Sequence, residues 1–201
     1  KAIQQKKTNI QIEKEKLIGS NITFYNKENN VILEKMISRA NFYLEKNEIA
    51  QGIVCPQENV IKSHLSLVKN LNLNEGIFVV SDNEKQGMNL TPDELNLLKP
   101  YYSSKEIERY FTKLNNKYWI FYLKSDINKK IEKFPNIKKH LDKFRDIITS
   151  DFKPYGLHRA RNEKFFNNEK IISIRKSDKP KFSYNNFPCY VSQTFNIIQS
   201  D

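Results

Sequence analysis

The chain has 201 residues, of which 38% are hydrophobic and 12% aromatic, so it can bury a core and is too apolar for a disordered chain. Its 34 Lys and Arg against 23 Asp and Glu leave a formal net charge of +11, which favours a polyanionic partner because phosphate neutralisation releases counterions. No apolar run reaches the length of a membrane span, no signal peptide is visible, and Cys55 and Cys189 form no metal or redox motif. We therefore expect a cytoplasmic chain with no membrane partner, whose cysteines are small buried hydrophobes.

The first 48 residues are predicted to be a linker and helical lead-in from a catalytic domain that lies upstream. Residues 1–20 are polar and rich in lysine, which is typical of a segment packed weakly on its neighbours. From Val31 to Leu44 the apolar side chains recur at helical spacing and predict a helix. The second domain is predicted to cover residues 49–201.

Strands and short helices are expected to alternate over residues 49–123. The patterns predict strands over 49–55, 76–80 and 118–123, and helices over 60–71, 91–99 and 104–110. Thr91 is a good N-cap, Pro92 fits the first helical position, Glu94 completes a capping box, and Pro100 is expected to stop that helix. The segment 118–123 is apolar on both faces, which predicts a central strand.

The last third of the chain begins with the clearest amphipathic helix. Over residues 134–149 apolar side chains recur every three or four positions, and lysines cover the other side as a solvated face. Beyond Ser150 the pattern changes to a loop followed by short strands over 171–174, 181–184, 189–191 and 195–198. The irregular order of strands and helices predicts an α+β fold, a twisted and mostly antiparallel sheet or distorted half-barrel decorated by helices.

Several kinds of catalytic chemistry are missing from the sequence. The five glycines are isolated, so no glycine-rich loop exists to hold a cofactor phosphate, and no Pro-Pro pair supplies the usual adenine-methyltransferase signature. No Glu-x-Lys supplies the second half of a common nuclease site. His64, His140 and His158 lack carboxylates or cysteines at ligand spacing, so no metal site is expected.

The strongest positive signal is the basic loop from Tyr155 to Arg161. On an extended loop Arg159 and Arg161 point to the same side, where either guanidinium can fork onto guanine or clamp a phosphate, with His158 beside them. The competing interpretation is an arginine pair that bridges to Asp151 or Glu163 and pins the loop.

Other cations are candidates for the DNA backbone. We predict phosphate contacts for Lys170, Arg175, Lys176 and Lys181, although lysines at a sheet edge also guard it against pairing. Lys105 or Arg109 is expected to contact the backbone as well. The nearby tyrosines, including Tyr110, are expected in the core, whereas Tyr155 and Tyr190 are assigned supporting or stacking roles.

A series of short blocks resembles one known family. The blocks are Gln51-Gly52-Ile53, Gly76-Ile77-Phe78-Val79, Lys99-Pro100-Tyr101, Lys105-Glu106-Ile107, Arg109-Tyr110, Phe134-Pro135, His140-Leu141, Tyr155 to Arg161, Glu169 to Ile172, Tyr190-Val191-Ser192 and Phe195 to Ile198. In this order and spacing, over residues 49–198, they resemble the TaqI-like C-terminal specificity domain. That domain follows the catalytic domain in adenine-specific DNA methyltransferases and in fused type IIG (Eco57I-like) restriction-modification enzymes.

The resemblance implies a target-recognition domain that grips double-stranded DNA and itself carries no catalysis and no cofactor. The methyltransferase domain of the same parent chain would use S-adenosylmethionine to methylate a flipped adenine, and a fused enzyme would add a nuclease. Two alternatives stay open. One is a docking domain of the same system with little direct DNA contact, and the other is an autonomous hydrolase or nuclease.

Overall fold

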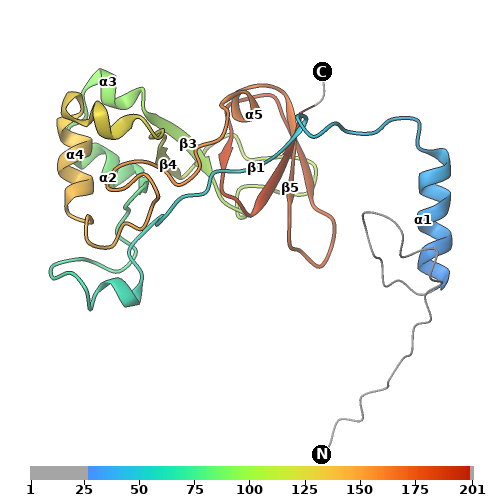
Figure 1. Cartoon of the computed structure of the whole chain (residues 1–201), viewed down its shortest axis with the longest axis horizontal. Helices are drawn as coiled ribbons and strands as arrows, with labels where there is room; N and C mark the ends of the chain where they lie inside the picture. The colour runs from blue at the N-terminus through green and yellow to red at the C-terminus, as the bar shows by residue number, and fades with distance from the viewer. Residues whose placement is uncertain (1–26, 200–201) are drawn as a thin grey trace, which may run out of the picture. The chain divides into compact units, whose positions relative to one another are not determined.

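The computed structural model describes residues 27–199 and divides between Tyr43 and Leu44 into two units. The first unit contains helix α1 (Lys27–Arg39), drawn in blue in Figure 1. A helix was predicted here over residues 31–44, but it ends at Arg39. The lead-in predicted over residues 1–20 lies outside the described residues.

The second unit contains two four-stranded sheets, which confirms the predicted α+β, mostly antiparallel fold but with two sheets in place of one (Figure 1). The first sheet has the order β1-β8-β5-β6, and every neighbouring pair in it is antiparallel. The second has the order β2-β4-β3-β7, in which only β3 and β7 are parallel. The bounds are β1 (Ile49–Gln51), β2 (Val79–Ser81), β3 (Leu98–Tyr102), β4 (Tyr118–Phe121), β5 (Lys170–Ile174), β6 (Phe182–Asn185), β7 (Tyr190–Val191) and β8 (Phe195–Ile198).

Short helices decorate the second sheet. They are α2 (Asp82–Gly87), α3 (Pro92–Leu95), α4 (Pro135–Asp142) and, nearer the first sheet, α5 (Lys164–Asn167), with 3-10 turns at Lys62–His64, Ile127–Lys129 and Ile131–Lys133. Within residues 27–199 no helix has both the length and the apolar character that crossing a membrane requires.

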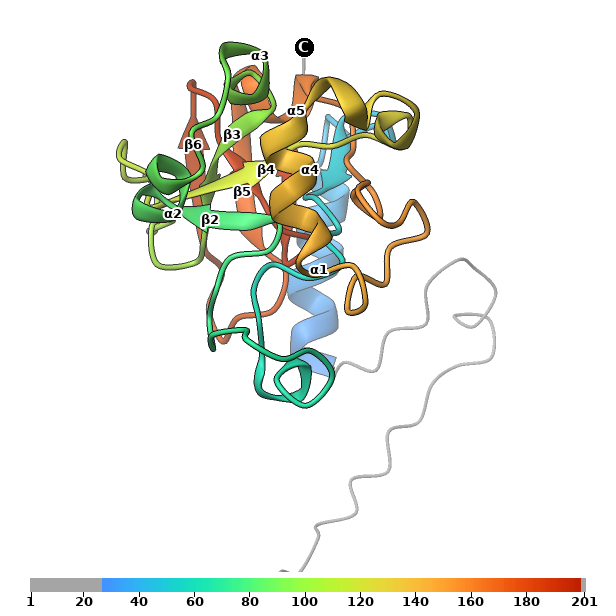
Figure 2. The ribbon, with the colours of Figure 1, turned by 90° about the vertical axis from the view of Figure 1, so that its left-hand side faces the viewer.

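Helix α4 lies in front of the second sheet in Figure 2 and is fixed to it by His140. The Nε2 of this histidine lies 2.9 Å from the carbonyl oxygen of Ile77, so Nε2 carries the proton and donates. Burial lowers the pKa of His140, which keeps the imidazole neutral next to the ring of Phe121. The helix predicted over 134–149 is confirmed only as far as Asp142. The later apolar residues Phe144 and Ile148 are still buried in the core, although they lie beyond the end of the helix.

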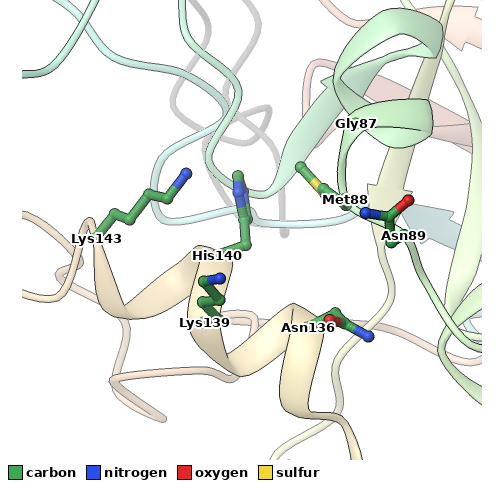
Figure 3. A pocket seen from close by; sticks show the side chains of 7 residues that line it. All are labelled: Gly87, Met88, Asn89, Asn136, Lys139, His140 and Lys143. Atoms are coloured by element: carbon green, nitrogen blue, oxygen red, sulfur yellow. The ribbon is translucent and has the colours of Figure 1, made fainter.

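The exposed side of α4 borders a cavity of about 210 Å³ that faces the end of α2 (Figure 3). Lys139 and Lys143 line it, together with His140, Met88 and Asn89. Both lysines are exposed, as a solvated face requires.

The start of α3 is capped as predicted. The side chain of Thr91 accepts from the backbone N–H of Glu94, and Glu94 accepts in return from the backbone of Thr91. The helix nevertheless ends at Leu95, because the chain then pairs with β4 as strand β3. Pro100 is compatible with this strand although it has no N–H to donate. At this position β3 has only β4 as a neighbour, because β7 pairs with Tyr101 and Tyr102 alone.

Two predicted helices are wrong. Over residues 60–71 only the turn Lys62–His64 is helical, because the backbone of Val60 bonds to Glu75 and Asn74 and folds the segment into a loop. Residues 104–110 form a turn and a hairpin rather than a helix, with Ile107 bridged to Thr112. Helix α2, which was not predicted, begins with Ser81 as its N-cap.

The segment 52–54 joins the two sheets. The N–H of Gly52 donates to Phe195 in the first sheet, and the N–H of Ile53 donates to Val191 in the second. Val54 then pairs with Arg159. A Cβ on Gly52 would overlap the backbone carbonyls of residues 191 and 192, so only glycine allows the strands this close.

Candidate nucleic-acid interface

The second half of the basic loop, residues 157–161, lies against the segment 52–54. The backbone groups of Val54 and Arg159 exchange hydrogen bonds of 3.0 and 3.1 Å. The neighbouring His158 is half-buried, and its Nδ1 lies 3.1 Å from the Oδ2 of Asp151. Arg159 is exposed, and its side chain has no hydrogen bond or ion pair to any residue of the described part of the chain. The loop is thus fastened through its backbone and through His158, while Arg159 faces solvent.

Arg161 holds the loop from its other end. Its Nε donates to the carbonyl of Gly52 at 3.3 Å, its Nη2 donates to the side chain of Gln51 at 3.4 Å, and its own carbonyl accepts from the hydroxyl of Tyr122 at 2.6 Å. Burial lowers the pKa of the guanidinium, and the neighbouring charge of Arg159 adds to this. Arg161 therefore positions the loop and is not presented to a ligand as Arg159 is.

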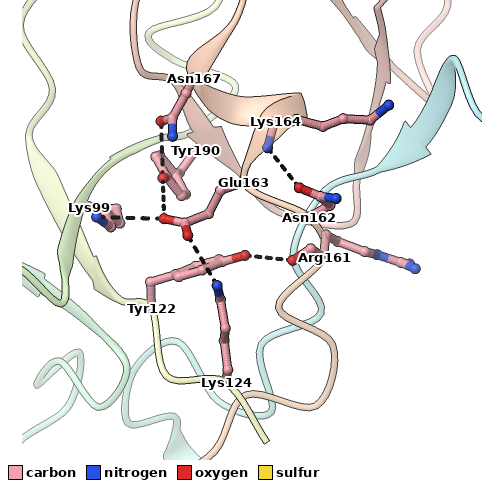
Figure 4. A network of polar contacts seen from close by, with 9 residues as sticks. All are labelled: Lys99, Tyr122, Lys124, Arg161, Asn162, Glu163, Lys164, Asn167 and Tyr190. Carbon is pink, nitrogen blue, oxygen red and sulfur yellow. Dashed lines mark hydrogen bonds and ion pairs between the residues drawn. The ribbon is translucent and has the colours of Figure 1, made fainter.

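Neither arginine bridges to Asp151 or Glu163, because these carboxylates have other partners. Glu163 lies 3.1 Å from the Nζ of Lys124 and 3.6 Å from the Nζ of Lys99 (Figure 4). Burial alone would raise the pKa of Glu163, but the hydrogen bond and the charges of the two lysines lower it below its ordinary value. The competing interpretation was right that the loop is pinned, but the pairing is different: Arg161 binds Gly52 and Gln51, and Asp151 binds His158.

The two tyrosines assigned supporting roles are anchors inside the domain. The hydroxyl of Tyr190 lies 3.2 Å from Glu163 and 3.1 Å from the side-chain oxygen of Asn167, as Figure 4 shows. Its ring stacks on Phe166 with 4.6 Å between centroids. Tyr155 is buried and donates to Asp142 at 2.7 Å, and burial together with this carboxylate raises its pKa to about 12. Any support they give to a DNA contact is indirect.

Two hairpins come together at the β6 edge of the first sheet. In the hairpin 107–112 the N–H of Glu108 donates to the carbonyl of Phe111 at 2.9 Å, which leaves Arg109 and Tyr110 as a two-residue tip. The other hairpin is formed by β5, β6 and the turn 175–181. The N–H of Tyr110 donates to the carbonyl of Phe182 at 2.6 Å, and these elements are called the paired hairpins below.

Cationic side chains cross the junction of the paired hairpins. The Nη2 of Arg109 donates to the carbonyl of Pro180 at 3.2 Å, and the Nζ of Lys181 lies 3.6 Å from Glu108. On the other flank of the turn 175–181, Arg175 and Lys176 line a cavity of about 270 Å³ with the turn 193–194. Four of the predicted cations therefore border these two hairpins.

The basic loop and the paired hairpins are linked through the turn 193–194. The Nη1 of Arg175 donates to the carbonyl of Gln193, and the N–H of Gln193 donates to the carbonyl of Ile53. Val54, which follows Ile53, pairs with Arg159. The segments that carry five of the predicted cations are thus connected to one another by hydrogen bonds. We call this set the basic strip, namely Arg109, Arg159, Arg175, Lys176 and Lys181.

Two of the predicted lysines do not join the basic strip. Lys105 is exposed but lines another cavity, which it shares with the carboxylates of Glu58 and Glu84. Lys170 is only 3% exposed, and its Nζ donates to two backbone carbonyls at 2.8 Å each. Burial lowers the pKa of the Lys170 ammonium to about 8. A phosphate cannot reach this ammonium, so Lys170 is left out of the interface considered below.

Exposed aromatic side chains lie among these cations. Tyr110 is 74% exposed, so its predicted place in the core is wrong, although Tyr101 and Tyr102 are buried as expected. The side chains of Phe111, Phe182 and Tyr184 are also exposed. The residue pattern of β6 did not predict this exposure. Alternating strands usually turn their aromatic side chains inward, but in β6 the small polar residues Ser183 and Asn185 are buried and the aromatic residues face outward.

No metal centre accompanies these groups in the part of the chain that the structure covers, since no three His, Cys, Asp or Glu side chains of residues 27–199 gather to hold an ion. The arrangement offers cations, aromatic rings and backbone groups. It can bind and orient a polyanion.

Comparison with known proteins finds similarity in structure only. No family model matches the chain, and no curated protein matches it. Among solved structures the chain is similar to part of MmeI, a type IIL restriction-modification enzyme solved in complex with DNA, with a TM-score of 0.50 and 12% identity. The match covers 77% of this chain and 19% of the MmeI chain. At the level of the fold, this similarity confirms the resemblance to a part of restriction-modification enzymes that was drawn from the sequence.

Proposed function

We propose that the chain is a sequence-specific recognition domain for double-stranded DNA, belonging to a type IIG restriction-modification enzyme or an adenine-specific DNA methyltransferase. It would position the target adenine for a catalytic domain of the same parent chain, where S-adenosylmethionine supplies the methyl group. Recognition in this chain requires no cofactor or catalytic group. The fold shared with part of MmeI, which was solved with DNA, supports the proposal.

The observation that carries the proposal is the basic strip with exposed aromatics beside it. Counterion release makes clustered Lys and Arg a general source of affinity for the phosphate backbone. Arginine also reads guanine edges, because its planar guanidinium donates two parallel hydrogen bonds to them. Arg159 suits that second role because its guanidinium has no partner in the described residues, while the backbone behind it is fixed on both sides.

Each group of residues then has a role. Arg159 contacts a base edge or a phosphate, and Arg175, Lys176 and Lys181 contact phosphates. Arg109 contacts the DNA backbone from the hairpin tip. His158 and Arg161 hold the basic loop in place. Lys105 contacts the DNA backbone outside the basic strip.

A second candidate function is docking to a protein partner with little direct DNA contact. The register places Ile49, Ile198, Ile171 and Tyr184 in one row across the first sheet, so their side chains share one face. Ile49 is 44% exposed and Ile171 is 41% exposed. Such an apolar row fits a partner protein, for example the methyltransferase domain.

Salt dependence separates the two functions. We expect the 201-residue chain to bind labelled duplex DNA in a fluorescence anisotropy assay, with an affinity that falls steeply between about 50 and 200 mM salt. A docking domain would bind duplex weakly, with little response to salt. Incubating the chain with plasmid and magnesium tests the nuclease alternative, which requires cleavage.

Replacing Arg159 by alanine should cost about 1–3 kcal/mol of binding to a duplex selected from a random pool, and less on random duplex, because a base contact is lost. Lys181→Ala should weaken binding to all sequences alike, because a phosphate contact is not specific. Lys143→Ala on α4 removes the same charge away from the basic strip and serves as the control. If Arg159→Ala and Lys181→Ala lost equal affinity on selected and random duplexes, the base-reading role would be wrong.

A further inference from the structure

The tip of the hairpin 107–112 holds a bulky residue in a conformation that favours glycine. Tyr110 has a φ of 79°, in the left-handed region. For a residue with a Cβ this costs about 1–2 kcal/mol, so glycine or asparagine is usual at such positions. A tyrosine here needs a reason other than the turn itself.

Contacts within the domain do not supply that reason. The hydroxyl of Tyr110 has no hydrogen bond to any residue between 27 and 199, and the ring is 74% exposed. The bonds that shape the tip, from Glu108 to Phe111 and from Tyr110 to Phe182, join backbone atoms, so glycine would make them equally well. The ring therefore contributes little to the stability of the hairpin.

The surroundings of the ring suit a nucleobase. The guanidinium carbon of Arg109 lies 6.0 Å from the ring centroid, held there by the bond from Arg109 to the carbonyl of Pro180. Phe111 adds a second exposed ring next to Tyr110. An aromatic face with a cation beside it stacks on a base while the cation neutralises the adjoining phosphate.

We propose that Tyr110 is a nucleobase-stacking residue, whose ring packs against a base that has left the stack of the bound duplex. The inference rests on the proposed DNA-recognition function and adds to it a site for an unstacked base. Residues in strained backbone conformations cluster at active sites and ligand-binding sites, so the conformation of Tyr110 supports a binding role. A ring on a fixed hairpin tip can enter a base step, where stacking offsets part of the cost of opening it.

The decisive variant is Tyr110→Gly, which removes the ring and relieves the backbone. We expect its midpoint of urea unfolding to be equal to or higher than that of the original chain. Its affinity for the selected duplex should fall about 5- to 150-fold, which corresponds to 1–3 kcal/mol per stacked base. The slope of log affinity against log salt should stay unchanged because no charge is lost. Tyr110→Phe keeps the ring and should bind like the original chain.

A mismatch scan tests the unstacked base directly. Duplexes with one mismatched pair at each position in turn should include a position where the original chain binds more tightly, because a mismatched base leaves the stack at lower cost. Tyr110→Gly should lose that gain, and Tyr110→Phe should keep it. The stacking role is overturned if no mismatch improves binding, if Tyr110→Gly binds like the original chain, or if Tyr110→Gly is less stable. Failure of the proposed function looks different, since the original chain would then show no salt-dependent binding at all.

Discussion

Alanine in place of Gly52 should destabilise the domain by about 3 kcal/mol or more. The added Cβ would overlap the backbone carbonyls of Val191 and Ser192, which cannot move aside as a flexible side chain would. These carbonyls belong to the pairing through which the segment 52–54 joins the two sheets. Urea denaturation followed by circular dichroism measures the loss.

The matched control is Gly87→Ala at the end of α2. A Cβ there would meet no heavy atom within 4 Å, and its φ is not in the left-handed region. Because alanine favours the helix over glycine, we expect unchanged or slightly higher stability. Equal losses in both variants would mean that the close approach at Gly52 is not what fixes the junction. Since Gly52 also accepts from Arg161, the Gly52→Ala variant should lose DNA affinity together with stability.

Replacing Glu94 by glutamine should cost about 2–4 kcal/mol of unfolding free energy at neutral pH. The fully buried carboxylate accepts from the backbone of Thr91 at 2.9 Å, of Asn136 at 2.7 Å and of Ile137 at 3.1 Å, and from the side chain of Asn136 at 2.8 Å. One side chain thus caps the starts of both α3 and α4. A glutamine would point an NH₂ group at some of these donors.

The cost of Glu94→Gln should depend on pH. Burial alone would raise the pKa of Glu94, but the four hydrogen bonds to the charged form lower it below its ordinary value of 4.5. A carboxyl whose pKa is lowered by folding contributes stability above its unfolded pKa and loses it as the pH falls through its folded pKa. The difference between the original chain and Glu94→Gln should therefore be constant near neutral pH and shrink below about pH 4.5. Asp93→Asn, at the neighbouring exposed position, serves as the control, and a pH-independent difference would contradict the prediction.

The sequence allowed prediction of the elements whose patterns are local. The strands near the C-terminus were predicted from short apolar runs between turn residues, and all four occur. The cap formed by Thr91 and Glu94 was also readable, because it depends on neighbours in the chain. By contrast, the strand Leu98–Tyr102 was missed, since its existence depends on pairing with Tyr118–Phe121 and Tyr190–Val191. The helix expected from Val60 failed for the same reason, because distant carbonyls compete for its backbone.

The candidate site shows the same division. An Arg-x-Arg loop in a lysine-rich chain was visible in the sequence, but which arginine stays free depends on the carbonyl of Gly52, more than a hundred positions away. The burial of Lys170 depends on the carbonyls of Asn168 and Phe187, and the second of these lies on the far side of a hairpin. Tyr110 is exposed because it lies at a hairpin tip, and no residue pattern around it predicted that tip.

The tip formed by Arg109 and Tyr110 is shaped by main-chain hydrogen bonds, so under the proposed function a side chain at the tip can serve DNA binding separately from the fold. Exchanges at position 110 that keep its N–H leave these main-chain bonds in place, so under the proposed function a change of target sequence need not be accompanied by compensating changes in the core. A library that randomises Arg159, whose side chain has no partner in the described residues, and is screened for duplexes with altered sequence, is expected to contain mostly folded members. If the chain recognises DNA as proposed, new specificities can arise by single exchanges of exposed side chains, while the backbone that carries them keeps its hydrogen bonds.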